Sequence, residues 1–418
     1  MKVRKTIAAL LFFAFFVPFI FSQPIEKDSP VISEIHIDGL KKTKESYVQE
    51  VLEKYKDAPV SELNLNDVEI TLQQMNLFSD IEVTYGHNDT GNCTLYITVE
   101  EKISFIPIPF AMYSSTTGFL GGLMVMDTNA FGVGNNYMVG GIFSGSMQMG
   151  VMMFTKPAIP RKRLGFQISG NFAHRTAKFD DAYANNVLEM ETLGGGAGFT
   201  LVDKFTEHVT VTAGVRYGYL NIDMESDPFG YGSDFETSHT FTLAAGWGLC
   251  YPISNEWFMS ERKVYVDGDF SFFVSGRKTQ SVTAGISIQQ PLPLSRLRVL
   301  AQAACYYAHN APLYMQGSQT TVGITIMPEK YRSPSLAGAN IGLELALAKT
   351  GFATFSVYGL YEYFVAKDFD DSRLNHMGYS LGAKMYLAKI AFPALALGFS
   401  HNVNRNKMKF VVAMGMRY

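Results

Sequence analysis

Residues that could carry out catalysis are few and scattered in this sequence of 418 residues. The eight histidines include no His-x-x-x-His pair for a metal, and the sequence has neither a Gly-x-Ser-x-Gly turn nor a glycine-rich phosphate loop. Ser238 and His239 are adjacent, but neighbouring residues of a strand point to opposite faces and cannot form a hydrolytic pair. We therefore expect a protein that is not an enzyme and uses no cofactor or metal.

The composition argues against several other classes of protein. Hydrophobic residues make up 47% of the chain and charged residues only 17%, against about 25% in an average globular protein. Disordered chains show the opposite balance. A net charge of −3 offers no basic stripe for nucleic acid, and three cysteines are too few for a disulfide framework or a zinc site.

The first 22 residues have the pattern of a secretory signal peptide. Lys2, Arg4 and Lys5 precede an apolar run over 7–21, which is shorter than the ~20 residues that a spanning helix needs. We expect cleavage near Ser22 and export from the cytoplasm, with an uncleaved N-terminal anchor as the alternative.

A change in charge near residue 102 predicts a domain boundary. Residues 23–102 hold 16 acids and 7 bases, whereas 103–418 hold 22 and 25. The first region alternates as a strand over 31–37, has two segments with helical spacing, and ends in two alternating segments. This order predicts a small α+β domain of the type β-α-α-β-β.

The second region has a period of two in segments of about 10–13 residues. Ordinary strands average ~5–6 residues, whereas a tilted strand that crosses a membrane needs ~9–11. In hydrocarbon every backbone group must be paired, so such strands must close into a barrel. We predict sixteen antiparallel transmembrane strands, from 105–113 to 407–418, with a soluble β-sandwich as the alternative. Long outer loops are expected at 175–189, 222–237, 309–338 and 365–375, and an unusually long connection on the other side at 251–262.

Charged residues of both signs occupy the polar phase of these segments and are expected to face the barrel lumen. They either pair with one another across the lumen or anchor a loop that folds into it. The main candidates are Asp267, Asp269, Glu344, Glu362 and Lys384.

The first predicted strand contains Pro107 and Pro109, which are two residues apart. Residues i and i+2 direct their backbone groups to the same neighbour, so both prolines withhold a donor from one neighbouring strand. We predict a lateral seam between the first and last strands that opens easily, unless 105–109 is only a linker. The predicted seam residues are Phe105, Pro107, Pro109, Phe110, Phe410, Met414 and Tyr418.

Several motifs in the sequence resemble those of a known protein family. The run Asn76-Leu77-Phe78 and the ending Val99-Glu100-Glu101 resemble those of a POTRA domain, a periplasmic polypeptide-transport-associated module. Asp127-Thr128-Asn129-Ala130-Phe131-Gly132-Val133-Gly134 resembles the first periplasmic turn of the outer-membrane assembly-factor and bacterial surface antigen superfamily, which includes BamA and TamA. Gly338-Ala339-Asn340 with Leu343-Glu344-Leu345 resembles the start of that family's twelfth strand.

One departure from the family concerns its sixth external loop. That loop carries a Val-Arg-Gly-(Phe/Tyr) tip whose arginine contacts acidic groups in the lumen. Here Thr321, Val322, Gly323 and Ile324 occupy the place, so the arginine position holds Val322. Arg332 is the nearby candidate for a substitute. The missing arginine puts insertase activity in doubt, though not the fold.

The resemblance implies a protein of the bacterial outer membrane, with residues 1–22 as signal, 23–102 as a periplasmic POTRA-like domain and 103–418 as the barrel. It implies assembly, insertion or translocation of unfolded outer-membrane protein clients, with periplasmic chaperones or assembly-complex partners as candidates and no nucleic acid. Two alternatives stay open: a dedicated polypeptide or lipid transporter, and a structural or pore-forming surface antigen. Tyr418 and its alternating neighbours read as the signal by which the barrel is itself assembled.

Overall fold

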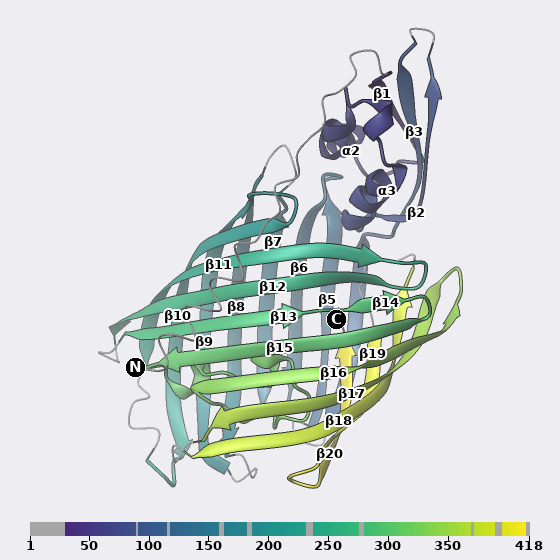
Figure 1. Cartoon of the computed structure of the whole chain (residues 1–418). Coiled ribbons are helices and arrows are strands. Elements are labelled where there is room, and N and C mark those ends of the chain that lie inside the picture. Colours follow the sequence, from purple (N-terminus) through teal and green to yellow (C-terminus); the bar gives the residue numbers. More distant parts are fainter. Residues whose placement is uncertain are drawn as a thin grey trace, which may run out of the picture.

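The computed structural model describes residues 30–414 except 89–90, 115–117, 159–162, 182–185, 231–236, 276–279, 369–371 and 389–394. The predicted signal segment and Tyr418 lie outside the described residues. Figure 1 shows a small α+β domain next to one rim of a large barrel. In the part of the chain that is described, no helix is long and apolar enough to cross a membrane.

The small domain follows the predicted order β-α-α-β-β. Its elements are β1 (Ile32–Asp38), α2 (Glu45–Leu52), the 3-10 turns η2 (Glu53–Tyr55) and η3 (Val60–Glu62), α3 (Leu65–Gln74), β2 (Phe78–His87) and β3 (Cys93–Glu101). The sheet order is β1-β3-β2, with β1 parallel and β2 antiparallel to the central β3.

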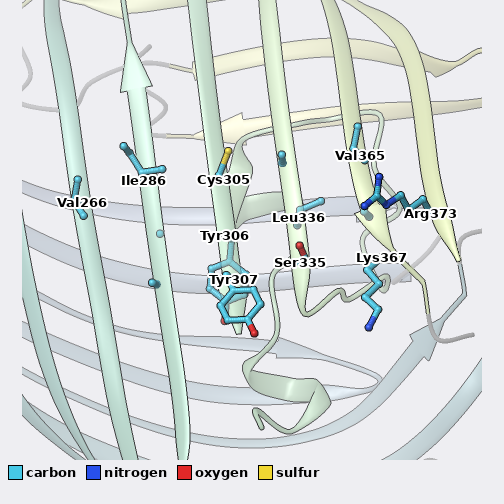
Figure 2. A pocket seen from close by; sticks show the side chains of 14 residues that line it. Val266, Ile286, Cys305, Tyr306, Tyr307, Ser335, Leu336, Val365, Lys367 and Arg373 are labelled. Carbon is cyan, nitrogen blue, oxygen red and sulfur yellow. The ribbon is translucent and has the colours of Figure 1, made fainter. Parts of the chain in front are cut away.

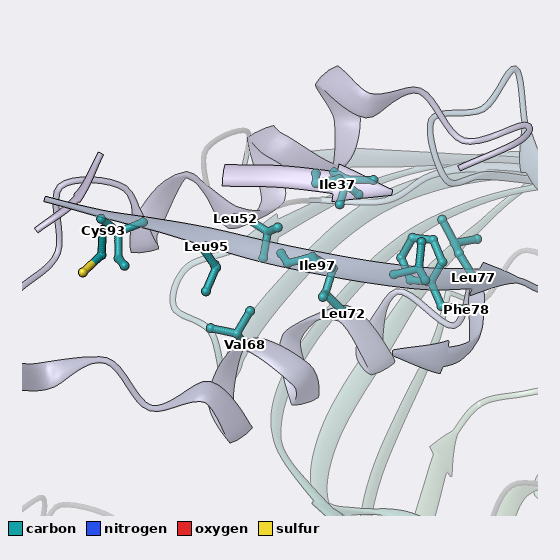
Figure 3. Packing of buried hydrophobic residues seen from close by; sticks show 12 residues of the cluster. Ile37, Leu52, Val68, Leu72, Leu77, Phe78, Cys93, Leu95 and Ile97 are labelled. Atoms are coloured by element: carbon teal, nitrogen blue, oxygen red, sulfur yellow. The ribbon is translucent and has the colours of Figure 1, made fainter. Parts of the chain in front are cut away.

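Apolar residues at helical spacing explain how the two helices pack on this sheet. Val48 and Leu52 of α2, with Val68 and Leu72 of α3, are fully buried against Leu95 and its neighbours on β3 (Figure 3). Asn64 caps α3, because its side chain accepts a hydrogen bond from the backbone N–H of Asn66. The domain therefore has a hydrophobic core of its own.

The remaining strands form a closed antiparallel barrel in which β20 is adjacent to β4. β13 and β14 lie in line and both pair with β15, so the described wall has sixteen strand positions, as predicted. The strands are β4 (Phe105–Ser114), β5 (Gly118–Ala130), β6 (Asn135–Ser144), β7 (Met147–Lys156), β8 (Leu164–Asp180), β9 (Asn186–Lys204), β10 (Val209–Ser226), β11 (Ser238–Ser254), β12 (Met259–Ser275), β13 (Ser281–Gln289), β14 (Leu292–Leu294), β15 (Leu297–His309), β16 (Ser335–Lys349), β17 (Ala353–Lys367), β18 (Arg373–Leu387), β19 (Leu395–Asn402) and β20 (Lys407–Met414).

Alternating side chains give the wall two faces. Leu343, Leu345 and Tyr361 are exposed on the outside, whereas Glu344 and Glu362 between them are buried on the inside. This is the pattern of a barrel with an apolar outer surface and a polar lumen.

Several predicted loops and turns were placed wrongly. Residues 175–180 and 186–189 continue β8 and β9 as a long hairpin, and β10 extends through Ser226 into the predicted loop 222–237. The connection predicted at 251–262 is only 255–258, because β11 and β12 run on and pair through Ser254 and Met259. Apolar and polar residues no longer alternate at these strand ends, as at the consecutive buried residues Val187 and Leu188, so the period-two signal fades although the backbone ladder continues.

Candidate functional site

The connection between β15 and β16 folds back inside the barrel. It contains the short 3-10 turn η5 (Leu313–Met315) and the single-turn helix α4 (Gln319–Val322). Val322, Ile324 and Ile326 are buried and pack against Leu336 and Phe364 of the inner wall. The tip that was predicted at Val322, Gly323 and Ile324 is thus held inside the barrel by apolar contacts.

Gly323 at the tip has a positive φ of 67°, and a Cβ there would lie 2.6 Å from the amide nitrogen of Gln302. The backbone conformation favours glycine at this position, whereas the close atom is the end of the flexible Gln302 side chain and can move.

The carboxylate of Glu362 supplies the polar anchor of the loop. It accepts a hydrogen bond from the Thr325 hydroxyl at 2.9 Å and one from the Ile326 backbone N–H at 2.9 Å. Asn402 of β19 donates to the Ile326 carbonyl at 3.1 Å. The Thr325 hydroxyl and the Ile326 backbone N–H therefore bind the carboxylate of Glu362 in the lumen. In the family that the sequence resembles, an arginine of this loop makes such a contact.

Arg332 does not take over the role of that arginine. In the described part of the chain its guanidinium donates to the backbone carbonyls of Glu329 and Tyr331, each at 2.8 Å, and lies 5.7 Å from the ring centroid of Phe179. It thus secures the outer part of the loop and makes no hydrogen bond to a lumen acid.

A second polar cluster lies near the rim that faces the small domain. Glu344 is fully buried between Arg298 at 2.5 Å and Lys384 at 3.2 Å. Hydroxyls of Ser356 and Tyr386 donate to it at 2.6 and 2.7 Å. The cluster ties together β15, β16, β17 and β18, which is an ion-paired lumen of the kind the sequence predicted.

Asp267 and Asp269 lie on the lumen face of β12, away from both clusters. Asp269 forms an ion pair with Arg216 of β10 in a half-exposed setting. Asp267 faces Gly285 of β13, and neither acid contacts the inward-folded loop among the described residues. The five predicted lumen acids and bases therefore separate into three groups rather than one site.

The small domain is fixed to the barrel through the turn after β5. Lys42 donates to both carboxylate oxygens of Asp127, at 2.7 and 2.8 Å, and to the Ser104 hydroxyl at 2.7 Å. The Asn129 side chain donates to the Thr43 hydroxyl at 2.8 Å. We call this contact between 41–47 and 127–134 the junction.

Glycines make the close approach at the junction possible. The Lys44 N–H donates to the Gly132 carbonyl at 2.8 Å, and a Cβ on Gly132 would lie 2.2 Å from the Lys42 carbonyl oxygen. A Cβ on Gly134 would lie 2.2 Å from the Tyr47 hydroxyl. A second contact joins Lys54 to Glu207 in the turn between β9 and β10 at 2.5 Å.

Glu101 holds the loop of the small domain that makes the junction. Its carboxylate accepts hydrogen bonds from the backbone N–H groups of Lys41, Lys42 and Thr43 at 3.1, 3.0 and 2.8 Å. Burial favours the neutral acid, but these hydrogen bonds outweigh it and hold the pKa of Glu101 below its ordinary value of 4.5.

We therefore expect the junction loop to weaken in acid. Above the ordinary pKa of 4.5 the group is ionised in folded and unfolded chains, so its stabilisation is complete. The stabilisation is lost as the pH falls below that value and through the lowered pKa of the folded state. The free energy of unfolding of the small domain, measured for the full chain and for E101Q from pH 7 to 3, should differ most at neutral pH and converge in acid. A difference that does not change with pH would contradict this role.

Comparison with known proteins supports both parts of the fold. The POTRA domain model of the FtsQ type matches residues 31–102, and the Omp85 superfamily domain model matches 129–317. The chain therefore contains a POTRA domain over 31–102 and an Omp85 superfamily domain over 129–317. A sequence comparison with curated proteins finds no match.

Solved structures agree in fold at low identity. BamA from Haemophilus ducreyi lacking POTRA domains 1–3 is 12% identical with a TM-score of 0.52, and the match covers 92% of this chain and 83% of that one. CdiB from Escherichia coli and CdiB from Acinetobacter baumannii, each 12% identical, have TM-scores of 0.61 and 0.60 and cover 92% of this chain and 73% of theirs. The barrel is thus an outer-membrane barrel with a periplasmic POTRA domain.

The predicted seam residues of this Omp85 barrel lie on β4 and β20. Phe105, Pro107 and Pro109 are exposed on the outer face of β4, and Phe410 is exposed on β20. Phe110 and Met414 belong to the same two strands, but their side chains, like all of Tyr418, lie outside the described part.

The lumen face of β4–β7, next to this seam, is apolar. Ile106, Met126, Met138 and Met153 are directly opposite one another across four strands. Met124 lies on the same face one row away and Met149 two rows away, and all five methionines are partly exposed. We call Met124, Met126, Met138, Met149 and Met153 the methionine face. Sequence reasoning missed it, because it concentrated on the charged residues of the lumen.

Proposed function

We propose that this protein inserts or translocates client polypeptides, and that clients leave through the seam between β4 and β20. Residues 1–22 are the signal, 23–102 the POTRA domain and 103–418 the barrel. The driving force is the folding of the client, whose backbone becomes paired in lipid without ATP or a cofactor. Periplasmic chaperones or assembly partners would meet the POTRA domain.

This proposal rests on which neighbouring strand the backbone nitrogens of Pro107 and Pro109 face. Thr128 N–H donates to the Ser104 carbonyl at 3.1 Å, in register with the pairing of Phe105 with Asp127. In an antiparallel ladder hydrogen-bonded positions alternate, so even-numbered residues of β4 bond to β5 and odd-numbered ones face β20. Pro107 and Pro109 therefore withhold their donors from the seam and not from β5.

One further feature supports an opening at this place. The methionine face lies directly inside the seam, where flexible apolar side chains suit varied client segments.

Replacing both prolines with valine should close the seam. The P107V/P109V variant gains two backbone donors toward β20, each net hydrogen bond contributing about 0.5–1.5 kcal/mol. We expect a more heat-resistant barrel and less client insertion, measured as folded client barrels in vesicles that contain the protein.

The matched control is I106V/I108V, which changes the same strand at positions whose N–H groups already face β5. It should insert clients like the wild type. If P107V/P109V also retains full activity, the seam is not the exit.

A pore-forming surface antigen is the second candidate, favoured by Val322 at the family's arginine position. A pore predicts large ion conductance in planar bilayers. Depletion of the protein in its host gives the broader test: loss of many folded outer-membrane barrels supports a general insertase, whereas no loss leaves a dedicated transporter or a surface antigen.

A further inference from the structure

Three residues of the methionine face lie side by side in one row across the wall. Met126 of β5 is directly opposite Met138 of β6, and Met138 is directly opposite Met153 of β7. Neighbouring strands lie about 4.8 Å apart, and side chains that point into a closed barrel converge toward its axis. The three thioether sulfurs can therefore approach one another on the lumen side.

Met124 adds a fourth thioether beside this row. It lies two residues before Met126 on the same face of β5 and is directly opposite Gly140 of β6. A Cβ on Gly140 would lie 2.6 Å from Cγ of Met124, so the Met124 side chain covers this glycine and lies beside Met138. Glycine at position 140 thus leaves the space through which a second row contributes a sulfur to the same cluster.

The surroundings of the four sulfurs are neutral. Asn136 is opposite Thr155 in the next row toward the periplasm, and Ile108 and Val151 belong to the next row toward the outside. Among the described residues of β4 to β7, these rows contain no carboxylate, imidazole or thiol. All four methionines are partly exposed, so an ion in the lumen can reach them.

We propose that Met126, Met138 and Met153, with Met124 beside them, bind Cu(I). Neutral thioethers are soft ligands that suit Cu(I), whereas Mg²⁺, Ca²⁺ and Mn²⁺ prefer oxygen ligands and structural Zn²⁺ sites use thiolates and imidazoles. The row lies next to Asp127 and the junction, at the periplasmic end of the barrel, so the ion enters from the periplasm. Binding here does not depend on whether clients leave through the seam.

The experiment titrates the full protein in detergent with Ag(I) in chloride-free buffer, because silver is a soft monovalent ion that keeps one oxidation state. Thiols also bind silver, and Cys305 is exposed in a hollow on the outer face of β15 (Figure 2). Every sample therefore carries C250A/C305A, while Cys93 is fully buried in the core of the small domain.

The variant M126L/M138L/M153L should bind one silver ion fewer than this parent. Leucine keeps the volume and the apolar character of methionine, so we expect the barrel to fold. M138L removes only the middle ligand and should bind silver at least about tenfold more weakly, since even the loss of a residue that supports a metal ligand costs roughly 10–100-fold.

M152L is the matched control on the same strand. Met152 lies on the outer face of β7, where its Cγ is 3.1 Å from the position of a Cβ on Gly170, much as Met124 covers Gly140 inside. M152L should bind as many silver ions as the parent. Equal silver binding by the parent and the triple-leucine variant would overturn the proposal.

NMR of isotope-labelled methionine methyl groups identifies the ligands in the parent itself. Ag(I) should shift the methyl resonances of Met126, Met138 and Met153 and leave that of Met152 in place. Zn²⁺ should shift none of them, because neutral thioethers bind it poorly. Equal shifts at Met152, or with Zn²⁺, would also contradict a soft-metal site in the lumen.

Discussion

Replacing Glu344 with leucine is expected to destabilise the barrel by about 3–5 kcal/mol, the cost of removing one partner from a buried ion pair. Arg298 and Lys384 are almost completely buried and would lose the carboxylate that compensates both charges. The measurement is urea-induced unfolding in vesicles, followed by the fluorescence of Trp247 and Trp257.

Two further variants test whether the loss of stability in E344L comes from the unpaired buried charges. In R298M/E344L/K384M all three charges are replaced by apolar side chains, and most of the stability should return. D269N breaks the half-exposed pair with Arg216 and should cost no more than about 1 kcal/mol. A stable E344L barrel would mean that the lumen there admits water.

The second large effect is expected at the junction. In G132A the new Cβ would lie 2.2 Å from the Lys42 carbonyl, at a residue whose φ is 71°. The clash adds to a backbone strain of roughly 1–2 kcal/mol. Opening of the junction should raise tryptic cleavage after Lys42 and Lys44 about tenfold or more, since tenfold corresponds to only ~1.4 kcal/mol.

The hairpin between β2 and β3 offers a matched control. Gly91 also has a positive φ, of 81°, but no atom of the described residues, which leave out 89–90, lies within 4 Å of the position of its Cβ. G91A therefore carries the same backbone strain without the clash. If G91A and G132A were cleaved alike, strain and not the junction would account for the effect.

The sequence was sufficient for the barrel and its strand count, because lipid and lumen impose opposite polarity on alternate residues. It was insufficient where a strand leaves the hydrocarbon. There the alternation of apolar and polar residues breaks down, as at the consecutive buried residues Val187 and Leu188, so the ends of β8, β9, β11 and β12 carried no clear signal.

The site was predicted less well, because its contacts join distant parts of the chain. Asp127 and Asn129 stood out as a family motif, but nothing in their spacing identifies Lys42 and Thr43 as partners. The missing arginine at Val322 put insertase activity in doubt. In the structure the Thr325 hydroxyl and the Ile326 backbone N–H donate to Glu362 instead, and no sequence motif predicts these two contacts.

The methionine face also has a chemical consequence. Oxidation turns each thioether into a polar sulfoxide and leaves the backbone ladder intact. An oxidant that entered the lumen would therefore convert the apolar lining beside β4 into a polar one without removing a charge or a strand. Enzymatic reduction of the sulfoxides would restore it, so the chemical character of this part of the lumen follows the redox state of the cell envelope.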